Sequence, residues 1–166
     1  MINSQINILK QAESYLNSVT NLQYTEIITP LFISSAGAHI RHILDHYQAI
    51  IIGLDAGFID YDQRSRGGKI ETDVTAALKL VDDIYDFLSS LTALQLQQKI
   101  QLSTEVSVEQ KQIEIVGSTV ARELVFVGSH AVHHFAMIDQ ISKAQKLVTP
   151  EQFGIAPATA TFLRNA

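Results

Sequence analysis

The chain has 166 residues, of which 46% are hydrophobic and 17% charged, a balance that suits one folded domain with a sizeable core. The formal net charge of −5 argues against a nucleic-acid surface, which normally carries an excess of lysine and arginine. Cysteine is absent, so disulfides and thiolate metal ligands are excluded.

The sequence also argues against export and membrane insertion. The first ten residues, MINSQINILK, lack the basic start and apolar core of a signal peptide. The apolar run AIIIGL at 49–54 is far shorter than the ~20 residues that a membrane-spanning helix needs. We therefore expect a cytoplasmic protein with a small-molecule substrate and no membrane or nucleic-acid partner.

The first half of the chain carries two helical patterns. Apolar residues recur with a helical period over 4–19, and again from residue 31 to about residue 55, directly after Pro30. Gly53 and Gly57 indicate where the second of these helices ends.

A loop and a third helix follow. The segment DYDQRSRGGKIETD at 60–73 is rich in turn-forming residues, and its Tyr61, Arg64 and Arg66 could close over a pocket and meet an anionic substrate; a solvated basic loop is the alternative. Thr72 or Asp73 can cap the next helix, whose apolar residues continue to about residue 91.

The pattern changes over KIQLSTEVSVEQKQIEIV at 99–116, where apolar and polar residues alternate and predict a short hairpin. A last long helix is expected to open near Ser118, as its cap, and to continue to Ile141, followed by an irregular tail from Val148. The predicted fold class is all-α: one domain over residues 1–166, a four-helix bundle with a short β-hairpin before the last helix.

All six histidines fall into two segments, HIRHILDH at 39–46 and SHAVHHF at 129–135. Residues four apart on a helix lie on nearly the same side, so His42 pairs with His46, and His130 with His134. Each pair lies about 80–120° from the apolar direction of its helix. His133 is expected to point to solvent.

Two histidine pairs on matching flanks predict a metal site between two helices. Neutral imidazole is a common ligand for divalent transition metals, and three protein ligands leave open positions for water or substrate. The helical geometry does not separate His42 from His46 as the third ligand. The alternative is that these histidines are ordinary surface residues at the edge of a bundle.

Two carboxylates lie near the predicted site. Glu123 stands one heptad before His130 on the same flank of the last helix, where a general base beside a metal-bound water would be needed. The alternative for Glu123 is a surface ion pair, with Arg122 or Arg41 as its partner. Asp45 could orient a ligand imidazole, or it could simply face solvent.

The segments SSAGAHIRHILDH and SHAVHHFAMI resemble the second and last bundle helices of the DinB-like (DinB/YfiT) superfamily, four-helix proteins proposed to be metalloenzymes. The resemblance covers nearly the whole chain in helix order, and STVARELVFVGSHAVHHFAMI resembles a bacterial subgroup. Carried over by position, it implies metal ligands at His42, five residues after Gly37, and at His130 and His134. His39 or His46 could add a fourth ligand, orient a ligand or relay protons.

The resemblance also implies a function. It indicates a divalent-metal-dependent enzyme with hydrolytic or thiol-dependent transferase chemistry, with Zn or Ni as the expected metal, Fe or Mn as further candidates, and a low-molecular-weight thiol as a further cofactor. The alternative is a non-catalytic bundle protein that binds metal or senses a ligand. The resemblance further implies a homodimer.

Overall fold

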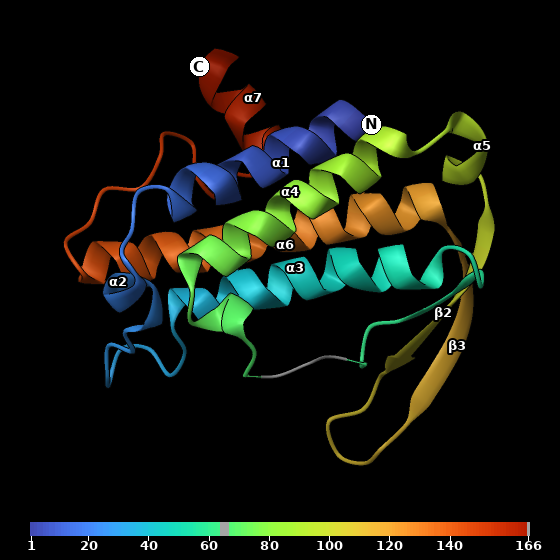
Figure 1. The fold of residues 1–166 in the computed structure, drawn as a ribbon, viewed down its shortest axis with the longest axis horizontal. Helices are drawn as coiled ribbons and strands as arrows, with labels where there is room; N and C mark the ends of the chain where they lie inside the picture. Colours follow the sequence, from blue (N-terminus) through green and yellow to red (C-terminus); the bar gives the residue numbers. More distant parts are fainter. Residues whose placement is uncertain (64–66, 166) are drawn as a thin grey trace.

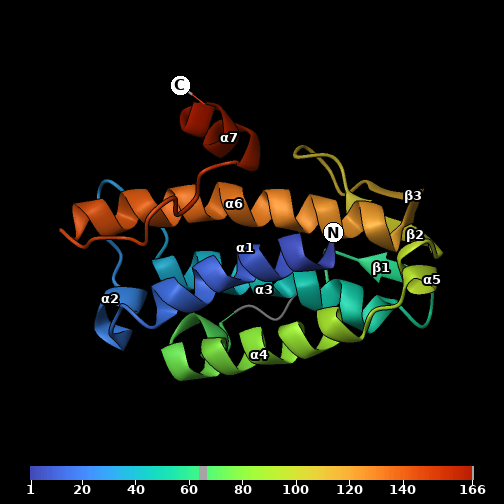
Figure 2. The ribbon, with the colours of Figure 1, turned by 90° about the horizontal axis from the view of Figure 1, so that it is seen from above.

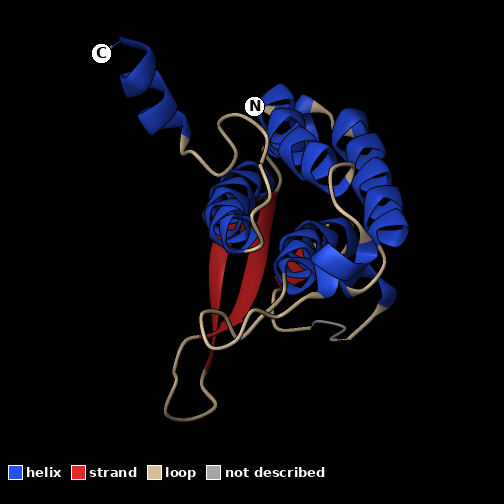
Figure 3. Cartoon of the chain, turned by 90° about the vertical axis from the view of Figure 1, so that its left-hand side faces the viewer, coloured by secondary structure: helices blue, strands red, loops and turns tan. Residues whose placement is uncertain are grey.

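Four long helices form the body of the protein: α1 (Ile2–Leu16), α3 (Ala36–Gly53), α4 (Val74–Ser90) and α6 (Val120–Ala144). Figures 1 and 2 show them side by side, and the end view in Figure 3 shows them arranged around a common core. The computed structural model describes residues 1–63 and 67–165, so Arg64 and Arg66 of the predicted pocket-closing loop lie outside the described residues. The predicted four-helix bundle is confirmed.

Shorter elements connect the bundle helices: α2 (Asn21–Thr25), β1 (Phe58–Asp60), the 3-10 helix η1 (Lys69–Glu71), α5 (Ala93–Leu96), β2 (Lys99–Glu105), β3 (Ile113–Thr119) and α7 (Pro157–Asn165). Among the described residues, no helix combines the length and the apolar character needed to cross a membrane.

The predicted hairpin is present and forms part of a three-stranded sheet. Strand β2 pairs antiparallel with β3, with Ser103 opposite Ile115, and parallel with β1 on its other side. The sequence analysis missed β1, because three residues are too few to show an alternating pattern. The hairpin projects from one end of the bundle (Figures 1 and 3).

Strand β3 continues directly into α6. Thr119 ends the strand and also caps the helix, since its side chain accepts a hydrogen bond from the backbone N–H of Arg122. The prediction that Ser118 caps this helix is wrong by one residue: the Ser118 hydroxyl donates to the Glu123 carboxylate instead. The strand therefore fixes where α6 starts.

Two other helix starts are set by caps. Helix α3 begins at Ala36 rather than at residue 31, because the Ser35 side chain accepts from the N–H of Ala38 and the preceding chain is not helical. Asp73 accepts from two backbone N–H groups at the start of α4, which confirms it over Thr72 as the cap.

The tail is only partly irregular. Up to residue 156 it packs as predicted: Phe153 is buried and stacks on Tyr15, with 5.4 Å between ring centroids. The prediction is wrong for the last residues, because Pro157 opens helix α7, which projects away from the bundle (Figure 3). Phe162 and Leu163 on α7 are exposed.

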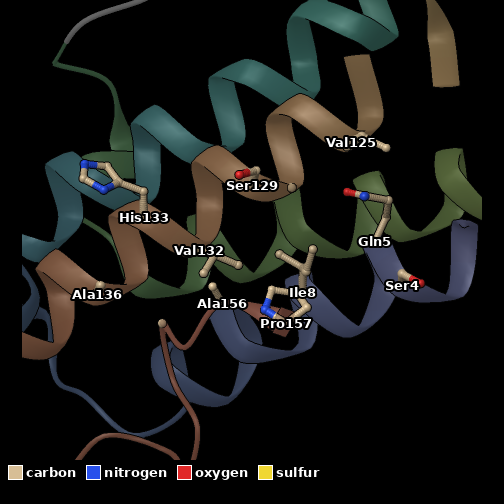
Figure 4. Close-up of a pocket in the computed structure, with 12 residues that line it drawn as sticks. Ser4, Gln5, Ile8, Val125, Ser129, Val132, His133, Ala136, Ala156 and Pro157 are labelled. Carbon is tan, nitrogen blue, oxygen red and sulfur yellow. The ribbon is translucent and has the colours of Figure 1, made fainter. Parts of the chain in front are cut away.

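An apolar groove with a volume of about 540 Å³ lies where α1, α6 and the start of α7 meet. Figure 4 shows Ile8, Val132 and Pro157 on its walls and His133 at one end. His133 is exposed, as predicted. The other five histidines lie elsewhere, between α3 and α6.

A close backbone contact holds α3 against η1. A Cβ atom on Gly37 would lie 2.1 Å from the backbone oxygen of Glu71, so no larger residue fits without displacing η1. Overpacking of this kind costs about 1–3 kcal/mol, and the better helix propensity of alanine offsets up to ~1 kcal/mol of that. We expect Gly37→Ala to lower the free energy of unfolding by about 1–2 kcal/mol, measured by urea denaturation with a chelator present.

Gly117 is the matched control, because a Cβ there meets nothing within 4 Å. Gly117→Ala should leave the urea midpoint nearly unchanged or raise it slightly. Equal midpoints for Gly37→Ala and Gly117→Ala would show that the approach of α3 to η1 is not close.

Candidate metal centre

The histidine cluster lies where α3 packs against α6. Helix α3 supplies His39, His42 and His46, and helix α6 supplies His130 and His134. One helical turn separates His42 from His46, and His130 from His134, so each pair projects from one side of its helix. Two segments almost ninety residues apart in the chain therefore contribute to one site.

The Nε2 atoms of two predicted ligands, His42 and His134, both lie close to Nε2 of the third, His130. His130 Nε2 lies 2.9 Å from His42 Nε2 and 3.1 Å from His134 Nε2. The rings of His42 and His134 are also adjacent, with centroids 4.6 Å apart. The structure thus brings His42, His130 and His134 together, while their role as metal ligands stays a prediction.

His46 belongs to the same cluster. One ring nitrogen from each of His42, His46 and His130 lies within 4.8 Å of the other two, a spacing that could hold a metal ion. The sequence did not separate His42 from His46, and the structure shows why: both reach His130 across the helix interface.

The donor set fits a divalent transition metal. Two ligand nitrogens at roughly 2.0–2.1 Å from a metal lie about 2.9 Å apart at right angles, and about 3.3–3.4 Å apart in a tetrahedron. The observed separations of 2.9 and 3.1 Å are close to both arrangements. Imidazole nitrogens suit Zn, Cu, Fe and Ni better than they suit Mg or Ca.

Burial keeps two of the rings neutral, which is the ligand form of histidine. Desolvation, with a smaller contribution from His130 and other histidines, lowers the pKa of His134 to about 3. Desolvation also lowers the pKa of His39, whose Nδ1 lies 2.8 Å from Nδ1 of His134. His39 Nε2 in turn lies 2.9 Å from the Ser34 hydroxyl, so a line of polar groups leads away from the cluster.

Glu123, the predicted general base, is fully buried. The Tyr61 hydroxyl donates to its Oε2 at 2.8 Å, and Arg122 and the Ser118 hydroxyl donate to its Oε1. The predicted ion pair with Arg122 is therefore present, but the prediction that Glu123 lies at the surface is wrong; Arg41 pairs with Asp45 and Glu71 instead. The role as general base stays a prediction, and it requires one of these hydrogen bonds to be exchanged.

Tyr61 connects Glu123 to the histidines. Its ring stacks on His46, with 5.1 Å between centroids and 26° between planes. Burial and the neighbouring Glu123 raise the pKa of Tyr61, so its hydroxyl keeps the proton that it donates. The sequence analysis placed Tyr61 on a pocket-closing loop; no signal in the sequence shows its contact with His46, since β1 brings the two together.

Phe126 forms another wall of the cluster. Its ring stacks on His130 with 5.7 Å between centroids, and it also lies 5.6 Å from the Tyr61 ring. Phe126 precedes His130 by four residues on α6, so helical spacing alone could have indicated this contact.

The protein is therefore a four-helix bundle in which histidines of two helices face each other. The structure is similar to YfiT from Bacillus subtilis, described as a probable metal-dependent hydrolase with an unusual four-helix bundle topology: TM-score 0.60, 17% identity, covering 89% of this chain and 86% of that one. It is similar also to a DinB-like protein from Bacillus subtilis, with TM-score 0.61, 17% identity and coverage of 89% and 98%. The fold is thus the DinB-like fold that the sequence resemblance predicts.

Comparison of sequences identifies fewer similarities than comparison of structures. No family model matches the chain. Among curated proteins, FK506-binding protein 5 of Rhizopus delemar is 28% identical over 107 residues, which is 64% of this chain. The chain spans only 28% of the length of that protein.

The low pKa of His134 makes the metal-free protein sensitive to acid. The folded-state pKa of about 3 is below the unfolded value of about 6.5, so protons bind the unfolded chain more readily. The stability from neutral His134 is complete above pH 6.5 and is lost as the pH falls toward 3. We expect His134→Asn to flatten the decline of the urea midpoint between pH 7 and 4, measured with a chelator.

Midpoints at pH 8 serve as the reference, because any difference there reflects packing rather than titration. An unchanged decline below pH 7 in His134→Asn would mean that this histidine is not kept neutral in the folded protein.

Proposed function

We propose that the protein is a divalent-metal-dependent enzyme that holds its metal through His42, His130 and His134 and acts on a small molecule. The observation that carries the proposal is the meeting of three Nε2 atoms from two helices, at separations of 2.9 and 3.1 Å about His130. Neutral rings at these distances can form N–H···N hydrogen bonds only in pairs, whereas one cation beside the three nitrogens would accept a lone pair from each of them.

The arrangement supports catalysis rather than a closed structural site. Three protein ligands leave positions for a water or a substrate atom. A divalent metal there lowers the pKa of bound water toward ~7, which suits hydrolysis, or holds a thiol as thiolate, which suits thiol transfer. YfiT, the similar structure described as a hydrolase, makes hydrolysis the first reaction to test.

The spacing of the nitrogens is compatible with Zn, Ni, Fe or Mn, because separations of 2.9 and 3.1 Å are close to both a tetrahedral and an octahedral arrangement. His39 and the other contacts of the cluster act on the ligands: the Nδ1 atoms of His39 and His134 face each other at 2.8 Å, which fixes the orientation of the His134 ring.

Metal binding is the direct test. Protein purified without affinity nickel should bind one ion per chain, and its affinity should fall steeply below about pH 6, because up to three protons compete with the ion for the imidazoles. The measurement is competition with a chelator between pH 5 and 8, corrected for protonation of the chelator. His130→Ala should weaken binding by roughly 100-fold or more, since His130 faces both other ligands.

The exposed neighbour His133 supplies the control, and His133→Ala should bind metal like the natural sequence. Affinity that stays flat from pH 7 to pH 5 would show that imidazoles are not the ligands. Bound metal raises the unfolding temperature under either function, so turnover separates the two: under the non-catalytic alternative the loaded protein hydrolyses no ester or amide and transfers no thiol.

A further inference from the structure

The proposed three-histidine site gives no role to His46. The structure nevertheless fixes the tautomer and the orientation of its ring. The Nδ1 atom of His46 lies 2.7 Å from the backbone carbonyl oxygen of His42. A carbonyl oxygen only accepts, so Nδ1 carries the proton and donates it, and the lone pair is on Nε2. This is the tautomer that a metal-binding histidine adopts when a carbonyl holds its other nitrogen.

The position of His46 suits the same task. Its side chain is buried, with 7% of the residue exposed, and its ring centroid lies 4.5 Å from those of His42 and His130. One nitrogen from each of these three residues lies within 4.8 Å of the others. His46 is thus near enough to share an ion with His42 and His130.

Two aromatic rings also pack against the ring of His46. Tyr61 stacks on it at 5.1 Å, and Phe126 lies at 6.2 Å. The Tyr61 hydroxyl is anchored on Glu123, which is completely buried and which also accepts from Ser118 and Arg122. A buried carboxylate with hydrogen bonds on both oxygens is a rigid anchor, because losing any one of them leaves buried charge less well compensated.

We propose that His46 is a fourth imidazole ligand of the metal and that Tyr61 and Glu123 are positioning residues that hold its ring toward the ion. The inference rests on the proposed metal-dependent function and deepens it. Four imidazoles would fill a tetrahedral site and leave no position for a substrate, whereas in a six-coordinate site they leave two. The fourth ligand therefore ties catalysis to a six-coordinate ion.

The ligands can be counted in the protein loaded with Co(II), because each bound imidazole gives one strongly shifted, exchangeable N–H resonance in the proton NMR spectrum. We expect four shifted resonances from the natural sequence and three from His46→Ala, with the affinity for Co(II) lower by roughly 10–100-fold. Three resonances from the natural sequence, and the same three from His46→Ala at equal affinity, would overturn the proposal. No shifted resonance and no binding would contradict the proposed function itself.

The positioning residues are tested by Tyr61→Phe, which keeps the stacked ring and removes the hydroxyl that Glu123 accepts from. Its affinity for Co(II) should fall by roughly 10-fold, and the shifted resonance assigned to His46 should move or broaden while the other three stay. Tyr85→Phe is the matched control, because the Tyr85 hydroxyl also donates to a glutamate, Glu13, but at a site between α4 and α1.

The control should bind Co(II) with unchanged affinity and give an unchanged spectrum. If Tyr61→Phe behaves in the same way as Tyr85→Phe, the two positioning residues have no role in holding the metal. Glu123→Gln should resemble Tyr61→Phe in the spectrum, since an amide has only one oxygen with which to accept what the carboxylate accepts on two.

Discussion

Five imidazole rings lie between α3 and α6, so closely packed that more than one positive charge among them is unfavourable unless it is the charge of a shared cation. Two protonated rings would repel each other across about 3 Å, and burial adds a desolvation cost to each charge. The lowered pKa of His134 is the direct sign of this constraint. Apolar side chains of both helices pack in the common core, and this packing places the histidines in contact at the edge of the core.

The small sheet is part of the same arrangement. Strand β1 leads to Tyr61, β3 ends at Ser118 and Thr119, and all three of these residues act on the first turn of α6 or on Glu123 within it. The hairpin therefore sets the start of the helix that carries His130. Its Ser118 also donates a hydrogen bond to Glu123, the buried carboxylate that accepts from Tyr61. Glu123 links the sheet to the histidine cluster, because it accepts from Ser118 and from Tyr61, whose ring stacks on His46.

Much of the fold could be predicted from local patterns. The helical period, the alternation over 99–116 and the i, i+4 spacing of the histidines each depend on neighbours within one or two turns, and each was confirmed. What the sequence could not show depends on how elements meet: both His42 and His46 reach His130, and only the packing of α3 on α6 shows this. The contact of Tyr61 with His46 likewise requires β1 to lie beside β2. The misplaced cap at Ser118 has the same origin, since its hydroxyl is taken by Glu123.

His42 and His130 are 88 residues apart in the chain, so an ion held by both closes a loop of that length. By the entropy argument used for covalent cross-links, a closure of this size removes conformations from the unfolded chain worth roughly 4–5 kcal/mol at 25 °C. A protein without cysteine could in this way have the stabilising effect of a disulfide. Unlike a disulfide, such a cross-link would open and close with the free concentration of the metal, so the stability of the folded chain would follow the metal supply.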